Sequence, residues 1–371
     1  MQQLPTAWVN PDTTLVIGAG AFVNSEVLRN EIKMVDAVMG VGSTKARLLI
    51  DYRASTHGPQ HTELSSKSGR HHSIGATGKG CSEAIVDKIR NRNNGYRLFA
   101  DTETADGFQA NLVDTERELN EAYDRGDQIL LEGTQGAMLD LHLGPYPYTT
   151  HKQTTASNWL SEAGLSPALK YEICLVVRTY PIRVAGNSGP MPGEISWYKL
   201  AGKINDGRHK EYYSPIVQPW ALMEYADACL KLSVSGKYHL PPGGRFDFHA
   251  WPQSLRDEYR VAVSEFHAEV LRELPDGTVK ELKKLFELTT VTGKLRRVAG
   301  MDIPLLLDAI RQNRPSYVAL TFLNYVFPEL WEKQEIHHKA AEYLDWLEGQ
   351  LGVPIKLVST GPRHEHILAF K

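Results

Sequence analysis

Cysteine is scarce in this chain, and that scarcity limits how the fold can be held together. Only Cys81, Cys174 and Cys229 occur among 371 residues, and no two are spaced as in a Cys-x-x-Cys motif. An odd number of scattered thiols fits neither a disulfide framework nor a structural zinc site. We therefore expect a reducing compartment, the cytoplasm, and no structural metal.

Long apolar runs and an excess of either charge are missing as well. No segment approaches the ~18 consecutive apolar residues of a membrane span, and the N-terminal stretch lacks the basic and apolar regions of an export signal. The net charge at pH 7 is −3, which argues against general nucleic-acid binding. We expect neither membranes nor nucleic acids as partners.

What the chain does contain is the make-up of a globular protein, 42% hydrophobic and 23% charged. Short runs rich in β-branched residues predict buried strands at 14–17, 46–50, 128–131, 173–178, 317–323 and 355–358. Helical period predicts helices over 26–38 (capped by Ser25), 112–123, 302–312 and 339–351. This alternation indicates an α/β fold with a mostly parallel central sheet and flanking helices, whose ligands bind beyond the carboxyl ends of the strands.

The middle of the chain departs from this pattern. Between about 196 and 282 the sequence mixes Trp197, Trp220 and Trp251 with a Pro-Pro-Gly-Gly run, and strands no longer alternate with helices. We therefore predict a single domain over 1–371 with an inserted or divergent subdomain at this place.

Two glycine-rich loops are candidates for ligand binding. Residues 73–80 place Thr77 and Lys79 among three glycines, and successive backbone N–H groups in such a loop bind anions. The loop lacks the Walker A spacing, and a plain flexible loop fits these residues equally well. In the second loop, 132–136, Gln135 follows a predicted strand, where it either reaches a ligand or caps the turn.

A basic loop and a last hydroxyl–glycine loop follow further along the chain. Three cations fall within four residues in the run 292–297, and arginine there can grip a carboxylate or phosphate, although a solvated basic turn is the common alternative. The run Ser-Thr-Gly-Pro at 359–362 follows the last predicted strand of the parallel set. None of the histidine pairs has a spacing typical of a metal site.

Gly18 and Gly20 support a different class of enzyme. They follow the first predicted strand, where a Gly-x-Gly admits a dinucleotide pyrophosphate, but Val23 stands where the third glycine of that fingerprint belongs. A tight turn is therefore the favoured interpretation. A dehydrogenase would also need an acidic residue after the second strand to hold a ribose, and Asp51 lies there.

Taken together and in order, the loops resemble those of the adenylosuccinate synthetases. The resembling runs are 75–80 (Gly-Thr-Thr-Gly-Arg-Gly in the family), 132–136 (Glu-Gly-x-Gln-Gly), 145–150, 182–190, 290–297 and 359–362. The resemblance implies a P-loop-NTPase-like synthetase fold that here lacks its first strand and phosphate loop. It also implies a homodimeric ligase that joins L-aspartate to the 6-position of a purine nucleotide, with a nucleoside triphosphate and magnesium.

The resemblance also assigns roles to individual residues. The purine nucleotide would be contacted by Thr77, Arg90, Arg92, Gln135, Thr150, Val184 and Lys294. Aspartate would be bound by Thr292, Gly293 and Arg296, and the triphosphate by Arg296, Asn324, Ser359 and Gly361. Gln135 would be catalytic, because it would hold the phosphorylated O6. The family supplies an arginine across the dimer that maps near Arg90 or Arg92, with Asn91 at the position itself.

The family's phosphate loop and its Ala-Gly-His segment have no counterpart here. In the family these supply the general base, the general acid and the magnesium ligands, so no metal ligand is assigned in this chain. Three hypotheses remain open. The start of the chain is misplaced, a second polypeptide completes the site, or the chain is a catalytically inactive nucleotide-binding remnant or subunit.

A second departure concerns the choice of nucleotide. Asn324 stands where the family reads guanine through an aspartate, and its NH₂ group is a donor suited to adenine. We therefore expect ATP or dATP, in place of the family's GTP, as phosphoryl donor. Lys294 replaces a family arginine. The combination is similar to a viral branch that uses dGMP, so IMP and dGMP both remain candidate substrates.

Overall fold

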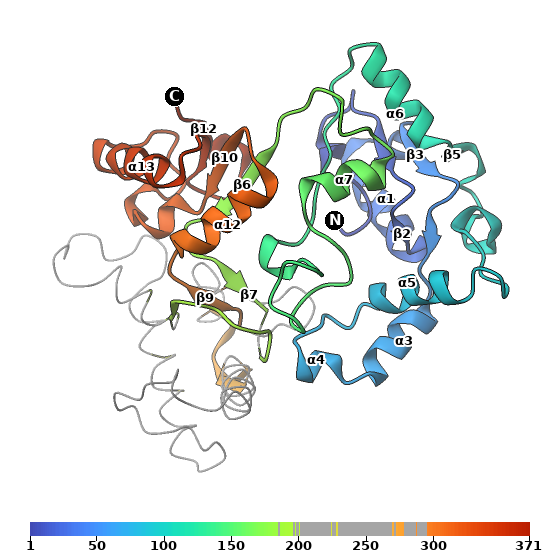
Figure 1. Ribbon diagram of the computed structural model, residues 1–371, viewed down its shortest axis with the longest axis horizontal. Helices are drawn as coiled ribbons and strands as arrows, with labels where there is room; N and C mark the ends of the chain where they lie inside the picture. Colours follow the sequence, from blue (N-terminus) through green and yellow to red (C-terminus); the bar gives the residue numbers. More distant parts are fainter. Residues whose placement is uncertain are drawn as a thin grey trace. The chain divides into compact units, whose positions relative to one another are not determined.

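The computed structural model describes residues 1–184, 186–195 and 295–371, together with positions 197, 200, 224, 228, 269–270, 272–277 and 287. Most of the predicted insertion at 196–282 therefore lies outside the described residues. The chain divides into two compact units. The first comprises Met1–His71 and Gly78–Tyr171, and the second comprises His72–Thr77 and Glu172–Lys371 (Figure 1).

The first unit is built on a parallel three-stranded sheet. Its strand order is β1-β3-β5, with β1 at Leu15–Ile17, β3 at Leu48–Asp51 and β5 at Leu112–Val113. A second, two-stranded parallel sheet pairs β2 (Phe22–Val23) with β4 (Ser55–Thr56). The helices of this unit are α1 (Ser25–Met39), α2 (Ser43–Ala46), α3 (Pro59–Lys67), α5 (Cys81–Arg90), α6 (Thr115–Asp124) and α7 (Ala156–Ala163), while the short α4 (Arg70–Ser73) ends in the second unit.

Helix α1 illustrates how side chains determine where a helix begins and which of its faces is buried. The side chain of Asn24 accepts a hydrogen bond from the Val27 N–H at 3.1 Å, so Asn24 is the cap and the predicted cap at Ser25 is wrong. Leu28, Ile32 and Val35 recur at helical spacing and are buried against the β1–β3 sheet core.

Two other predictions in the first unit need correction. Residues 128–131 form no strand, and Leu130 in that run is 82% exposed. The predicted helix at 112–123 divides into β5 and α6, because Asp114 caps the helix by accepting from the N–H of Arg117.

The second unit contains the larger sheet. Its order is β12-β11-β10-β6, in which β6 (Cys174–Arg178), β10 (Tyr317–Thr321) and β11 (Ile355–Ser359) are parallel and β12 (Ile367–Ala369) is antiparallel. A smaller antiparallel sheet, β7-β9-β8, joins Ile182–Arg183, Arg297–Ala299 and Glu194–Ile195. The predicted helices near the C-terminus are confirmed as α12 (Ile303–Asn313) and α13 (His338–Leu351).

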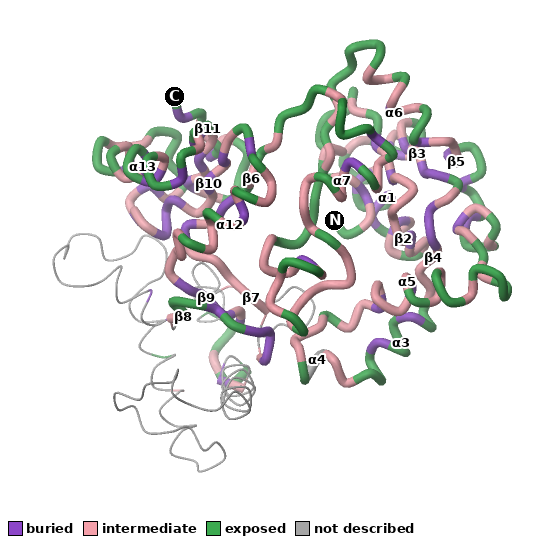
Figure 2. The backbone as a smooth tube through the Cα atoms, viewed as in Figure 1, coloured by how far each residue is buried: buried purple, intermediate pink, exposed green. Residues whose placement is uncertain are grey.

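The core of the second unit lies around β10. Val318 and Leu320 are fully buried and belong to one cluster with Leu344 and Leu347 of α13. Figure 2 colours the chain by burial and includes buried backbone at β10. Burial of each such side chain contributes about 1.5–3 kcal/mol. Strand β6, at the edge of the sheet, leaves Val176 66% exposed. The central strand therefore fixes the position of the loops that follow it.

Short 3₁₀ helices connect several of these elements. They are Thr6–Val9, Phe99–Asp101, Glu103–Ala105, Gln109–Asn111, Ala137–Leu139, Leu323–Tyr325, Pro328–Leu330 and His364–His366. Within the described part of the chain, no helix combines the length and the apolar character that crossing a membrane requires.

Candidate functional site

The glycine-rich loop that begins at Ser73 is held at its first half by the second unit. The side chain of Asn187 donates to the Ser73 carbonyl at 2.7 Å. Gly75 has a left-handed φ of 70°, and a Cβ there would lie 2.7 Å from the Cβ of Ser188. Only glycine fits without displacing the neighbouring chain. Thr77, two residues further on, is exposed and therefore accessible to a ligand.

The second half of this loop is held by the first unit. The Lys79 carbonyl lies 2.7 Å from Nε2 of His57, while Asn24 donates its amide to Nδ1 of that ring at 3.2 Å. Because Asn24 uses its oxygen to cap α1, His57 is neutral with its hydrogen on Nε2, and burial lowers its pKa. At Gly80, φ is 86° and a Cβ would lie 2.5 Å from the carbonyl carbon of His61. Each half of the loop is thus held within its own unit.

Gln135 lies in a loop whose backbone is strained. Its φ is 74°, in the left-handed region that residues with a side chain rarely adopt, and its side chain is exposed. The carboxylate of the nearby Glu132 accepts from the N–H and the hydroxyl of Thr6, at 3.0 and 2.8 Å. Strain of this kind is retained where the surroundings fix the backbone, commonly at functional sites.

Thr150 belongs to a loop that is organised by a buried carboxylate. Asp140 is 1% exposed and accepts from the backbone N–H groups of His142 and Thr154, at 2.9 and 2.6 Å. Burial opposes ionisation, but these hydrogen bonds hold the pKa of Asp140 below its usual value. The N–H of Thr150 donates to the Leu139 carbonyl at 2.7 Å, and its partly buried hydroxyl lies 3.3 Å from Nδ1 of His151.

Val184 lies beside a buried arginine that the sequence analysis had grouped with the ligand-binding cations. Arg297 forms two hydrogen bonds of 2.6 Å with Glu194 and donates to the Ser188 hydroxyl and the Gly189 carbonyl. The Ser188 hydroxyl donates in turn to the Val184 carbonyl at 2.7 Å. The sequence left open which arginine of the run 292–297 could grip a ligand. The donors of Arg297 are committed to shaping this loop, so Arg297 is a structural group.

Of the other residues in the basic run 292–297, the structure describes Arg296 but not Lys294. The N–H of Arg296 donates to the Glu287 carbonyl, and its carbonyl accepts from the Trp197 indole at 2.6 Å. The backbone on both sides of Arg296 is thus anchored. Thr292, Gly293 and Lys294 lie outside the described residues.

Asn324 lies beyond the carboxyl end of β10 and is 2% exposed. Its Nδ2 atom is buried and, among the residues that the structure describes, meets no acceptor. Phe322 precedes it with a φ of 63°, and the Arg178 guanidinium packs 3.6 Å from the centre of that ring. A buried amide donor without a partner is costly, so this position is prepared for a hydrogen-bond acceptor.

Ser359 and Gly361 follow β11, the strand next to β10. The Ser359 hydroxyl donates to the Gly361 carbonyl at 3.0 Å. A Cβ on Gly361 would lie 2.5 Å from Nδ1 of His366, so the chain approaches that ring closely. The predicted triphosphate residues after β10 and β11 therefore lie at the carboxyl ends of two adjacent parallel strands, where α/β folds bind ligands.

The arginines expected to contact a nucleotide phosphate lie at the end of α5. Arg90 and Arg92 are both exposed, and Asn91 between them donates to Asp87 at 2.6 Å. A pocket of about 210 Å³ opens beside this helix end. Its lining includes Asn91 and a different arginine, Arg97. The sequence analysis had named Arg90 and Arg92 as phosphate contacts but not Arg97, which lines this pocket.

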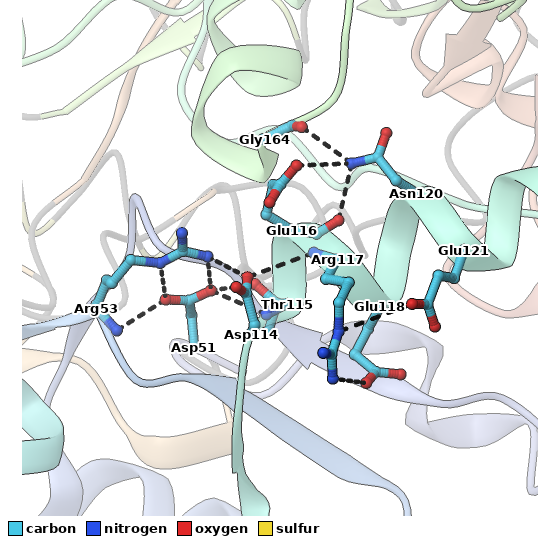
Figure 3. Close-up of polar contacts among 10 residues, drawn as sticks. All are labelled: Asp51, Arg53, Asp114, Thr115, Glu116, Arg117, Glu118, Asn120, Glu121 and Gly164. Atoms are coloured by element: carbon cyan, nitrogen blue, oxygen red, sulfur yellow. Dashed lines mark hydrogen bonds and ion pairs between the residues drawn. The ribbon is translucent and has the colours of Figure 1, made fainter.

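The dinucleotide hypothesis finds no support in the geometry. A Cβ on Gly20 would lie 2.6 Å from side-chain atoms of Glu162, so the Gly-x-Gly run serves a tight packing contact. Asp51, the presumed ribose ligand, accepts from the side chains of Arg53 and Thr115 (Figure 3). Burial tends to raise the pKa of Asp51, but these hydrogen bonds lower it to about 2. Asp51 is therefore a structural group.

Metal binding has no visible ligand set in the described ranges. No group of three or more histidine, cysteine, aspartate or glutamate side chains lies close enough there to hold a metal ion.

Comparison with solved structures shows the fold. The fold is similar to that of the cyanophage S-2L succinoaminodeoxyadenylate synthetase (PurZ) bound to dGMP and dATP as an energy donor, with a TM-score of 0.63 and 20% identity over 100% of this chain and 80% of that one. It is also similar to the fully ligated adenylosuccinate synthetase from Plasmodium falciparum, with a TM-score of 0.64 and 16% identity over 99% and 87%. The predicted α/β class is confirmed, and the fold is that of these synthetases.

The family follows from the sequence comparisons. A family model described as adenylosuccinate synthetase matches residues 1–105 and 98–328. The adenylosuccinate synthetase of Methanocaldococcus jannaschii is 28% identical over 98% of this chain and 79% of its own length, and that of Pyrococcus sp. (strain ST700) is 27% identical over 99% and 83%. The chain belongs to the adenylosuccinate synthetase family and is a carbon–nitrogen ligase of that type.

One residue of this region was missed by sequence reasoning. Asn187 is 7% exposed, and one end of its amide holds the glycine-rich loop. It lies three residues after the predicted contact Val184, within a Gly-Asn-Ser-Gly run that resembles an ordinary turn. Nothing in the sequence distinguishes an asparagine that only shapes a turn from one with an unused polar atom.

Proposed function

We propose that this chain joins L-aspartate to the 6-position of IMP or dGMP while a nucleoside triphosphate is cleaved to the diphosphate and phosphate. The family membership supports a purine nucleotide ligase of this kind. The observation that carries the proposal is the glycine-rich loop, in which Gly75 and Gly80 have left-handed φ values and Thr77 is exposed. Successive backbone N–H groups in such a loop bind anions.

The reaction proceeds in two displacements. The purine O6 attacks the γ-phosphorus, and the base loses its N1 proton as the 6-phosphoryl intermediate forms. The aspartate amine then attacks C6, the bond from C6 to the phosphorylated oxygen breaks, phosphate leaves, and the amine gives up a proton. Gln135 would stabilise the phosphorylated O6 by donating from its amide, a type of stabilisation that is strongest for developing charge. No step is assigned to magnesium.

The remaining predicted residues would bind the substrates. Thr77, Thr150 and Val184 would contact the purine monophosphate, and its phosphate would meet Arg90 or Arg92 from a second copy of the chain in a homodimer. Arg296, with Thr292 and Gly293, would hold the carboxylates of aspartate, and Lys294 would contact the nucleotide sugar. A guanidinium binds a carboxylate through two parallel hydrogen bonds.

The phosphoryl donor is proposed to be ATP or dATP. The buried Nδ2 of Asn324 is a donor without an acceptor among the described residues. Adenine presents an acceptor at N1, whereas guanine presents an N1–H that would face another donor. Ser359 and Gly361, at the end of the neighbouring strand, would border the base.

Product formation tests the reaction. The purified chain, given aspartate, magnesium and ATP with either IMP or dGMP, should release phosphate and form the N6-succinyl nucleotide, as detected by mass spectrometry. Nucleotide binding without any product would contradict the proposal and favour the inactive nucleotide-binding hypothesis.

Exchange of Asn324 for aspartate tests the donor. In Asn324→Asp, an acceptor replaces the NH₂ donor, so the ratio of kcat/KM for ATP over GTP should fall by at least about tenfold. Asn30→Asp is a matched control, because that side chain is exposed on α1. A wild-type preference for GTP, or an unchanged ratio in folded Asn324→Asp, would refute the assignment.

A further inference from the structure

Asn187 carries a buried polar atom that the fold does not use. Its Nδ2 donates to the Ser73 carbonyl at 2.7 Å, and this contact fixes the orientation of the amide, because the flipped form would set two oxygens against each other. The other end, Oδ1, is buried and has no donor among the residues that the structure describes. Buried amide oxygens are rarely left in this state unless something else pairs with them.

The surroundings hold this oxygen in place. Gly75 approaches the segment closely, since a Cβ there would lie 3.2 Å from the Asn187 carbonyl. The Ser188 hydroxyl is committed to the Val184 carbonyl, and Arg297 donates to Ser188 and to the Gly189 carbonyl. The neighbouring polar groups therefore already have partners, and Oδ1 remains as a rigid acceptor.

The position of this acceptor in the chain points to the purine monophosphate. Asn187 binds the start of the loop that carries Thr77 and lies three residues after Val184. Thr77 and Val184 are the two contacts with the purine nucleotide proposed for this unit. An amide oxygen repels phosphate oxygens and accepts only from N–H or O–H groups. Its partner on a purine nucleotide is therefore on the base or the sugar.

The reaction itself narrows the choice on the base. The base of IMP, hypoxanthine, has one N–H donor, at N1. Guanine has the same N1–H and, in addition, the exocyclic 2-amino group. Phosphorylation of O6 removes the N1 hydrogen, so N1 cannot remain a donor through both displacements. The 2-amino group keeps its hydrogens throughout.

We propose that Asn187 is a specificity-determining residue whose Oδ1 accepts a hydrogen bond from the 2-amino group of dGMP. The inference rests on the proposed function, because it needs a purine monophosphate beside the glycine-rich loop. It selects dGMP over IMP as the substrate. A site that leaves a buried acceptor unpaired with the wrong ligand discriminates strongly against that ligand.

Four ligands that differ by single groups test the assignment. Calorimetric titration of the wild-type chain with dGMP, dIMP, GMP and IMP should give a Kd for dGMP at least about tenfold below that for dIMP. Asn187→Leu, which removes the acceptor, should bring this ratio close to one. Asn111→Leu is the control, because both hydrogens of that buried amide are bound to backbone carbonyls. That variant should unfold more easily yet keep the wild-type ratio.

The possible outcomes distinguish a failure of this inference from a failure of the proposed function. If none of the four ligands binds, the proposed function itself fails. If dGMP and dIMP bind equally well to the wild-type chain, only the role of Asn187 is overturned, and this comparison needs no folded variant. Retention of the dGMP preference in folded Asn187→Leu would also overturn it. So would a preference for GMP over dGMP that disappears in the variant, because Oδ1 would then read the sugar.

Discussion

Asp51 and Asn324 occupy comparable places at the ends of parallel strands in two sheets and use their polar atoms in opposite ways. Asp51 ends β3, and its oxygens accept from the backbone and side chains of Arg53 and Thr115 (Figure 3). Asn324 follows β10, and its Nδ2 has no acceptor within the described ranges. Position at the carboxyl end of a strand is thus not enough to indicate a ligand. The remaining hydrogen-bonding capacity separates a structural group from a binding group.

The largest effect that this comparison predicts is on stability. Asp51→Asn removes a buried charge from its guanidinium partner, so the free energy of unfolding should fall by about 3 kcal/mol. Urea denaturation measures the change. Asp127→Asn is the control, because Asp127 pairs with Arg125 at an exposed site and should lose less than about 1 kcal/mol. Equal losses of unfolding free energy in Asp51→Asn and Asp127→Asn would contradict the structural role of Asp51.

Lowering the pH should remove the contribution of the ionised Asp51 carboxylate to stability. With a folded pKa of about 2 for Asp51 and an unfolded value near 3.9, its ionisation stabilises the fold above roughly pH 4, and this contribution of roughly 2 kcal/mol is lost as the pH falls towards 2. Other carboxylates titrate in the same range, so the difference between wild type and Asp51→Asn is the quantity to follow. We expect the difference in urea midpoints to shrink between pH 6 and pH 3. A constant difference would show that the charge of Asp51 does not matter.

The smallest stability effect is expected at Asn324. Asn324→Leu keeps the size of the side chain and removes a donor that no described acceptor uses, so stability should change by less than about 1 kcal/mol. The ability to discriminate ATP from GTP should nevertheless be lost. Thermal melting and competition kinetics on one preparation measure both. A stability loss like that of Asp51→Asn would mean that Asn324 is structural as well.

The sequence predicted the elements whose signals are local. The strands at 14–17 and 317–323, and the helix that stops before Gly352, are confirmed with small shifts at their ends. The run 128–131 has the composition of a strand but no pairing, and pairing depends on chain far away in sequence. Similarly, charge spacing placed Arg297 in a ligand loop, whereas its partner Glu194 is recognisable only in three dimensions.

The candidate site was predictable to the extent that its residues belong to continuous loops. The loop at 73–80 was found because its glycines are adjacent, and the structure explains Gly75 and Gly80 by positive φ and close contacts. Asn187 was missed because the significance of an asparagine depends on which of its atoms remain unpaired. The ligand-binding roles of all the site residues stay predictions from the sequence, and Thr292, Gly293 and Lys294 also lie outside the described residues.

The course of the chain through its two compact units limits how the protein can be dissected. Residues 72–77 pack with the second unit although the first unit continues on both sides of them. No single cut therefore releases an intact half. A fragment ending at Tyr171 would carry Ser73 and Gly75 without Asn187 and Ser188, the residues that hold them. Complementation between two separately expressed pieces would have to rebuild the glycine-rich loop from both partners.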